Sequence, residues 1–129
     1  MNREIKFRGQ RLENGEWIYG DLYHTDDLTC ICDWSIRPHT VENFAVDPST
    51  VGQYTGLKDE KGAEVYEGDI LNVSFGDIVV PLYVVFDCGG WKIREQYDET
   101  LHDLESYASC KETVVVIGNI YDNPQLLNQ

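Results

Sequence analysis

Short apolar runs separated by polar, glycine-containing turns recur along most of this 129-residue chain. Residues 70–75 alternate apolar and polar side chains, which is typical of a strand with one buried face. Residues 78–86 form the most hydrophobic run, and Pro81 within it favours a sheet edge or a bulge because proline has no backbone donor. The same pattern predicts further strands over 5–8, 17–23, 28–36, 41–46, 51–57, 63–66, 91–97 and 112–121.

One helix is expected, over residues 99–108. Leu101 and Leu104 recur at helical spacing, and Asp98 or Thr100 can cap the first turn. Acidic residues near its start suit the positive end of a helix dipole. The chain therefore contains many short strands and one short helix.

This pattern predicts a mainly β fold (α+β with one short helix) in a single domain spanning 1–129. An N-terminal β-hairpin lobe is expected over about 1–50, and a small bent sheet or SH3-like barrel over about 51–122. Residues 123–129 should form a C-terminal turn. Within the core, residues 66–120 are the part expected to form the SH3-like unit.

Four blocks of the sequence resemble the YopX family of phage and prophage proteins. In chain order they are IKFRG from Ile5, NGEWIYGD from Asn14, VGQYTGLKDEKGAEVYEGDI from Val51 and VIGNIYDNP from Val116. The resemblance implies a small, mostly β protein encoded by bacteriophages or integrated prophages. It implies no established activity, and it supplies no catalytic residue to carry over.

The N-terminus leads into charged residues, and no apolar run approaches the roughly 20 residues that a membrane helix requires. We therefore expect a cytoplasmic protein of the bacterial host cell, without membrane association. The formal net charge of −13 argues against nucleic acid as a partner. Direct binding to DNA or RNA is not expected, because it depends on Lys and Arg displacing counterions from phosphates.

The few basic residues are unevenly distributed. Arg3, Lys6, Arg8 and Arg11 lie in the first eleven positions, and acidic residues greatly outnumber basic ones after that. A solvated, soluble surface is the ordinary interpretation of such an excess of acid. Two functional alternatives stay open: a basic N-terminal strand that complements an acidic neighbour, or an acidic surface that mimics a phosphate backbone.

Cysteine and histidine give weak evidence for a metal site. A structural zinc site uses four ligands at paired short spacings, and this sequence has one C-x-C pair without a second pair. We expect buried reduced thiols, with no metal and no cofactor. The residues concerned are Cys30 and Cys32, the distant Cys88 and Cys110, and the potential additional ligands His24 and His39.

Catalytic candidates are equally weak, and no catalytic residue is assigned. Glu67 and Asp69 flank Gly68 where a strand begins, and such paired carboxylates can act as acid and base. At this spacing they more often accept backbone N–H bonds in a turn, and Asp87 invites the same interpretation. His102 lies among acidic residues on the expected helix, without a recognisable nucleophile nearby.

Aromatic residues are abundant, and with so few cations they favour core packing or a protein–protein interface over base stacking. They include Trp17, Tyr19, Trp34, Tyr54, Tyr66, Tyr83, Trp91 and Tyr121. The favoured function is a non-enzymatic interaction module, either a homo-oligomer or a binder of a host or phage protein. The alternatives are an acidic nucleic-acid-mimicking decoy acting on a host DNA-binding protein, and a small hydrolytic enzyme using Glu67 with Asp69, or His102.

Overall fold

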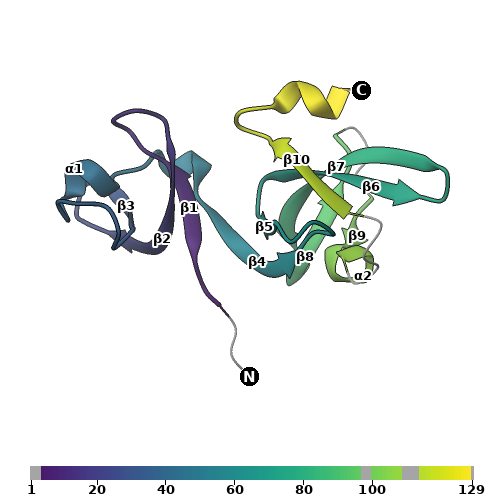
Figure 1. Ribbon diagram of the computed structural model, residues 1–129, viewed down its shortest axis with the longest axis horizontal. Helices are drawn as coiled ribbons and strands as arrows, with labels where there is room; N and C mark the ends of the chain where they lie inside the picture. The colour runs from purple at the N-terminus through teal and green to yellow at the C-terminus, as the bar shows by residue number, and fades with distance from the viewer. Residues whose placement is uncertain (1–3, 97–99, 109–113, 129) are drawn as a thin grey trace. The chain divides into compact units, whose positions relative to one another are not determined.

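The computed structural model describes residues 4–96, 100–108 and 114–128, which form two five-stranded antiparallel sheets and two short α-helices (Figure 1). The mainly β class is confirmed. The chain divides into two compact units, Met1–Tyr54 and Thr55–Gln129, near the lobe boundary expected at about residue 50. Within the described residues, no helix has both the length and the apolar character needed to cross a membrane.

The first sheet has the order β3-β2-β1-β4-β5. Its strands, in that order, are Thr29–Cys32, Trp17–His24, Phe7–Gln10, Gly52–Lys58 and Glu64–Tyr66. In unit 1, β1 pairs antiparallel with β2 on one side and with the start of β4 on the other. Helix α1, Val41–Phe44, and the 3₁₀ turn η1, Pro48–Thr50, connect β3 to β4.

The core of unit 1 lies where β2, β3 and α1 meet. Strand β3 is buried on both faces, because Ile31 packs on one side and Cys30 and Cys32 on the other. Phe44 anchors α1 in the same cluster. The buried members are Ile18, Cys30, Ile31, Cys32, Phe44, Ala45 and Val46.

The second sheet, in unit 2, has the order β10-β6-β7-β8-β9. Its strands, in that order, are Val114–Asn119, Asp69–Phe75, Ile78–Asp87, Gly90–Arg94 and His102–Asp103. Helix α2, Leu104–Ala108, follows β9, and η2, Pro124–Asn128, follows β10. The buried core comprises Val65, Leu71, Val73, Leu82, Val84, Ile93, Leu104 and Val114.

In the part of the chain that the structure describes, Pro81 lies where strand β7 has a hydrogen-bonded neighbour on one side only, as expected for a residue without a backbone N–H. It lies opposite Asn72 of β6, whereas β8 pairs with Tyr83–Asp87 of the same strand. Among the described residues, Pro81 therefore has a ladder partner on one side only.

Three predictions need correction. Residues 41–44 form α1 instead of a strand, and only Ala45 and Val46 make β-bridges, to Cys30 and Arg11. In place of the helix expected over 99–108, the structure has the shorter helix α2, Leu104–Ala108. His102 and Asp103 pair with β8 instead and form strand β9. Asp98 and Glu99 lie outside the described residues. Within those residues neither sheet closes into a barrel, so the SH3-like barrel becomes an open sheet.

Candidate functional site

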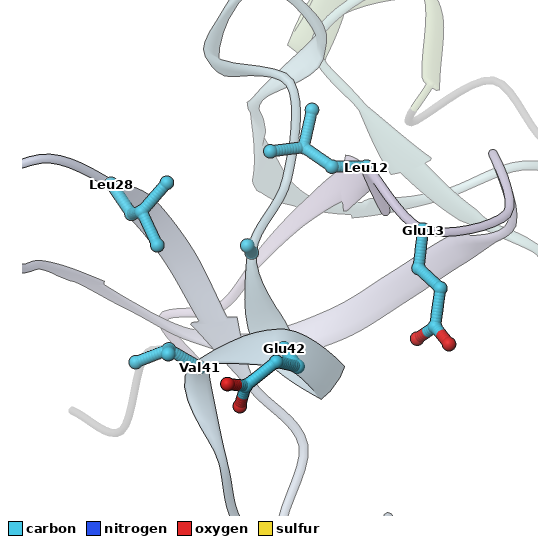
Figure 2. A pocket seen from close by; sticks show the side chains of 6 residues that line it. Leu12, Glu13, Leu28, Val41 and Glu42 are labelled. Atoms are coloured by element: carbon cyan, nitrogen blue, oxygen red, sulfur yellow. The ribbon is translucent and has the colours of Figure 1, made fainter.

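Helix α1 contributes to two clefts on the surface of unit 1. The first, here called the apolar cleft, has a volume of about 500 Å³, within the range of ligand-binding pockets. Figure 2 shows the side chains around this opening, which come from the β1–β2 connection, the residue before β3, and α1 with the residue that follows it. Its lining consists of Leu12, Glu13, Leu28, Val41, Glu42 and Ala45.

The apolar cleft combines exposed aliphatic side chains with acidic neighbours. Leu12 is 58% exposed and Val41 37%, and complete burial of such a side chain contributes up to about 1.5–3 kcal/mol. Glu13 and Glu42 place carboxylates beside these apolar groups (Figure 2). The site can therefore receive an apolar group that carries positive charge next to it.

Arg11 holds the two walls of the apolar cleft together. Its Nε donates to the Asn43 carbonyl of α1 at 2.9 Å, and a guanidinium nitrogen donates to Asn43 Oδ1 at 3.2 Å. The same guanidinium pairs with Glu13 at 2.9 Å. The β1–β2 connection is thereby tied to α1, so the cleft is formed before any ligand arrives.

The second opening, here called the aromatic cleft, has a volume of about 370 Å³. Strand β2, strand β3 and α1 each contribute to it, together with the segment between β3 and α1. His39 Nε2 lies 3.1 Å from the Trp34 carbonyl oxygen, which fixes the imidazole in place. The lining consists of Asp21, Tyr23, Cys32, Trp34, His39 and Phe44.

Cys30 and Cys32, two residues apart on β3, face the same side and lie opposite Tyr23 and Asp21 of β2. Burial, followed by the charges of Asp21 and Asp33, raises the pKa of the Cys32 thiol above its ordinary value of 9.0. Cys32 is thus a neutral thiol at pH 7, which is the opposite of an activated nucleophile. Burial and the neighbouring Cys30 raise the pKa of Tyr23 to about 12.

These pKa shifts predict that the protein loses stability at alkaline pH. The folded protein holds the Cys32 proton more tightly than the unfolded chain, so stability is full below pH 9.0 and falls as the pH rises above it. Tyr23 adds the same trend between 10.0 and about 12. We expect the thermal midpoint to fall over this range, less steeply in Cys32→Ala than in the wild type or in a Cys88→Ala control at an exposed thiol. Identical slopes in all three proteins would contradict this.

The structure brings Cys32 and His39 to one cleft but places His24 at the end of β2, opposite Thr29. Cys88 is exposed in the β7–β8 turn, and Cys110 lies outside the described residues. Over residues 4–96, 100–108 and 114–128, no group of three or more His, Cys, Asp or Glu side chains is arranged to hold a metal ion. The absence of a metal stays a prediction.

Two of the candidate carboxylates, Asp69 and Asp87, accept backbone N–H groups in turns. Asp69 is buried, and its Oδ2 accepts the Tyr66 backbone N–H at 2.7 Å, as in the turn interpretation. Asp87 likewise accepts the N–H of Cys88 at 2.7 Å. Glu67 is half-buried beside this turn. His102 lies on β9 opposite Ile93 and lines neither cleft of unit 1.

The basic residues near the N-terminus are engaged within unit 1. Lys6 pairs with Glu4 at 3.4 Å and lies 5.2 Å from the centre of the Tyr54 ring. The Arg8 guanidinium lies 4.7 Å from the centre of the Trp17 ring, and Arg11 supports the apolar cleft as described. Arg3 lies outside the described residues.

Sequence reasoning missed both clefts, because each is assembled from segments far apart in the chain. The available signals were the aliphatic residues Leu12 and Val41 beside Glu13 and Glu42, and an indole in the turn-rich segment after β3. Trp34 is 65% exposed, whereas Tyr54 and Tyr66 are buried, so the aromatic inventory divides between surface and core.

Comparison with known proteins gives a family and a fold. A family model described as "YopX protein" matches residues 6–128. The crystal structure of protein EF1440 from Enterococcus faecalis is similar, with a TM-score of 0.57 and 20% sequence identity over 98% of this chain and 99% of that chain. At this identity the likeness establishes the fold alone. A search of curated proteins found no match.

Proposed function

Because this chain belongs to the YopX family, a membership that brings no established activity with it, we propose from its surface that it is a non-enzymatic protein-interaction module. The apolar cleft supports this proposal most directly. Its occupant is an apolar side chain of a host or phage protein, next to a Lys or Arg in the same segment.

The chemistry of the cleft favours this occupant. A buried leucine-sized anchor contributes about 1.5–3 kcal/mol, which suits the central position of an interface. Glu13 already pairs with Arg11, so a neighbouring cation would approach Glu42, in a chain of net charge −13. Such complementarity mainly speeds association and selects against acidic partners. Because Arg11 already joins the two walls, the cleft loses little further conformational entropy when a partner binds.

The acidic-decoy alternative has less support, because several carboxylates are engaged by backbone N–H groups of their own turns. Asp33 accepts from Ser35, Asp47 from Ser49, Asp59 from Lys61, Asp69 from Tyr66 and Asp87 from Cys88. A phosphate mimic instead needs carboxylates presented outward to a partner. The hydrolytic alternative also gains no support from Asp69, whose carboxylate is buried in such a contact.

Self-association is a second candidate, favoured by the surface of unit 2. Strand β7 exposes Ile78 and Val79 near the β6–β7 turn, and Phe86 near its other end. A homo-oligomer that covers these side chains would remove apolar area from water.

The proposal predicts that charge placed in the apolar cleft abolishes partner binding. We expect Leu12→Asp and Val41→Asp each to weaken capture of the partner from induced or infected host cells at least about tenfold, through lost apolar burial. Ile5→Asp, at an aliphatic residue outside the cleft that is about as exposed as Leu12, is the matched control and should bind like the wild type.

The captured protein must also contain a short segment with an apolar residue next to Lys or Arg that binds the purified full-length chain as a synthetic peptide. Light scattering of the same variants separates the two candidates, because dissociation of an oligomer by Val41→Asp would show that a second copy occupies the cleft. Equal capture by wild type and Val41→Asp would refute the proposal.

A further inference from the structure

The aromatic cleft has ring surfaces arranged around one opening. The Trp34 and His39 rings meet edge-to-face, with centroids 5.1 Å apart and planes at 84°. His39 and Phe44 are stacked, with centroids 6.0 Å apart and planes at 27°. Tyr23 adds a further ring to the lining. The lining of this opening therefore includes several aromatic rings, and exposed ring faces are surfaces with which cations interact.

The aromatic cleft is also negatively charged. The Asp21 carboxylate lines it, and Asp33 is close enough for its charge to act on the Cys32 thiol. The cysteine itself stays a neutral thiol, so it adds no charge of its own to the cleft. Aromatic faces together with a carboxylate constitute the chemistry that recognises ammonium and guanidinium groups.

Part of the aromatic surface that lines this opening is exposed to solvent. Trp34 is 65% exposed although it lies beside the core residue Phe44. Tryptophan exposed next to a preformed hollow is typical of binding surfaces, where it supplies large contact area at small entropic cost.

We propose that the aromatic cleft binds a cationic side chain, Arg or Lys, of a partner polypeptide, with Trp34 as the ring platform and Asp21 as the counter-charge. This site goes beyond the function proposed above, since it uses other residues and takes a cation instead of an apolar group. Phe44 of α1 lines it, whereas Val41 and Glu42 of the same helix line the apolar cleft. Each site can therefore fail without the other.

The test is an NMR titration of the ¹⁵N-labelled full-length chain with Nα-acetyl-arginine methylamide. Nα-acetyl-citrulline methylamide serves as its neutral isostere, and Nα-acetyl-lysine methylamide as the second cation. We expect the arginine probe to shift the Trp34 indole N–H signal and to bind at least about fivefold more tightly than the citrulline probe.

Two variants locate the binding. Trp34→Ala should weaken arginine-probe binding about tenfold and Asp21→Asn about threefold to tenfold, because one removes the ring and the other the charge. Both residues are exposed, so neither change should disturb the core. Ile5→Ala, at an exposed residue that lines neither cleft, is the control and should leave the probe's affinity unchanged.

Equal affinity for the arginine and citrulline probes would overturn the proposal, as would unchanged binding in Asp21→Asn. Choline is an additional probe: if it binds at Trp34 while neither amino-acid probe does, the occupant is a small ammonium compound and the assignment to a partner side chain is wrong. None of these results depends on the identity of the partner that occupies the apolar cleft.

Discussion

Replacing Asp59 with alanine should destabilise unit 2 by roughly 3–5 kcal/mol, a large fraction of the 5–15 kcal/mol typical of a whole domain. Asp59 is only 8% exposed, at the connection between β4 and β5. One carboxylate oxygen accepts the backbone N–H groups of Lys61 at 2.9 Å and Ala63 at 2.8 Å. The other accepts the N–H of Val116 in β10 at 2.9 Å.

The size of the effect follows from how many donors depend on one side chain. Three backbone N–H groups lose their acceptor at once, and each such loss costs about 1–3 kcal/mol when water cannot fully replace it. The contact with Val116 also joins residues far apart in sequence, so its loss loosens β10 from the hairpin. The nearby backbone bond from Glu60 N–H to the Val114 carbonyl, at 3.1 Å, would be weakened with it.

Guanidinium denaturation of Asp59→Ala, compared with Asp77→Ala in the exposed β6–β7 turn, measures this loss. The control should change stability by less than about 0.5 kcal/mol. Amide hydrogen exchange should speed up at Lys61, Ala63 and Val116 in the Asp59 variant. A variant within about 1 kcal/mol of wild type would show that water or the backbone satisfies these donors, contrary to the role assigned here.

Gly20→Val should destabilise unit 1 by about 2–4 kcal/mol, because no side chain fits at this position of β2. A Cβ atom added at Gly20 would overlap the Cys32 carbonyl oxygen and lie 2.8 Å from its carbonyl carbon. Both obstacles are backbone atoms of β3, so the strand itself must move. Since Cys32 lines the aromatic cleft, the variant should also lose arginine-probe binding.

The matched control is Gly90→Ala in β8. A Cβ there meets only the end of the Lys92 side chain, at 3.6 Å, which is an ordinary contact. Its effect should stay within about 0.5 kcal/mol of zero, because restricting the unfolded chain offsets small losses. The thermal unfolding midpoints of Gly20→Val, Gly20→Ala and Gly90→Ala test this difference between the two positions. If all three variants have the same thermal midpoint, β3 approaches β2 less closely than the structure shows.

The strands that the sequence predicts well are those with a strong local pattern. Residues 70–75 alternate and 78–86 are apolar throughout, and the structure has β6 and β7 there. Helix α1 was missed because Val41, Phe44 and Val46 suggest a strand, whereas burial of Phe44 and the bridges of Ala45 and Val46 decide the local structure. The start of α2 was missed because pairing with β8 draws His102 into a strand.

Function-related features were less predictable, because they depend on contacts between distant residues. Asp59 is one polar residue in an expected hairpin loop, and nothing local indicates that Val116 will meet it. The turn interpretation of Asp69 succeeded because its bond to Tyr66 is local. The apolar cleft requires the β1–β2 connection, the residue before β3 and α1 to be placed together, and the aromatic cleft requires β2, β3 and α1. No short motif encodes either arrangement.

The most direct test of the interaction-module account is site-specific photocrosslinking in host cells, with a benzophenone amino acid placed at Val41 and, as a control, at Ile5. We predict that position 41 crosslinks one protein through a segment holding an apolar residue beside Lys or Arg, and that position 5 does not capture it. Crosslinking of that protein from position 5 but not from position 41, or capture at position 41 of an acidic segment lacking such a pair, would contradict the account.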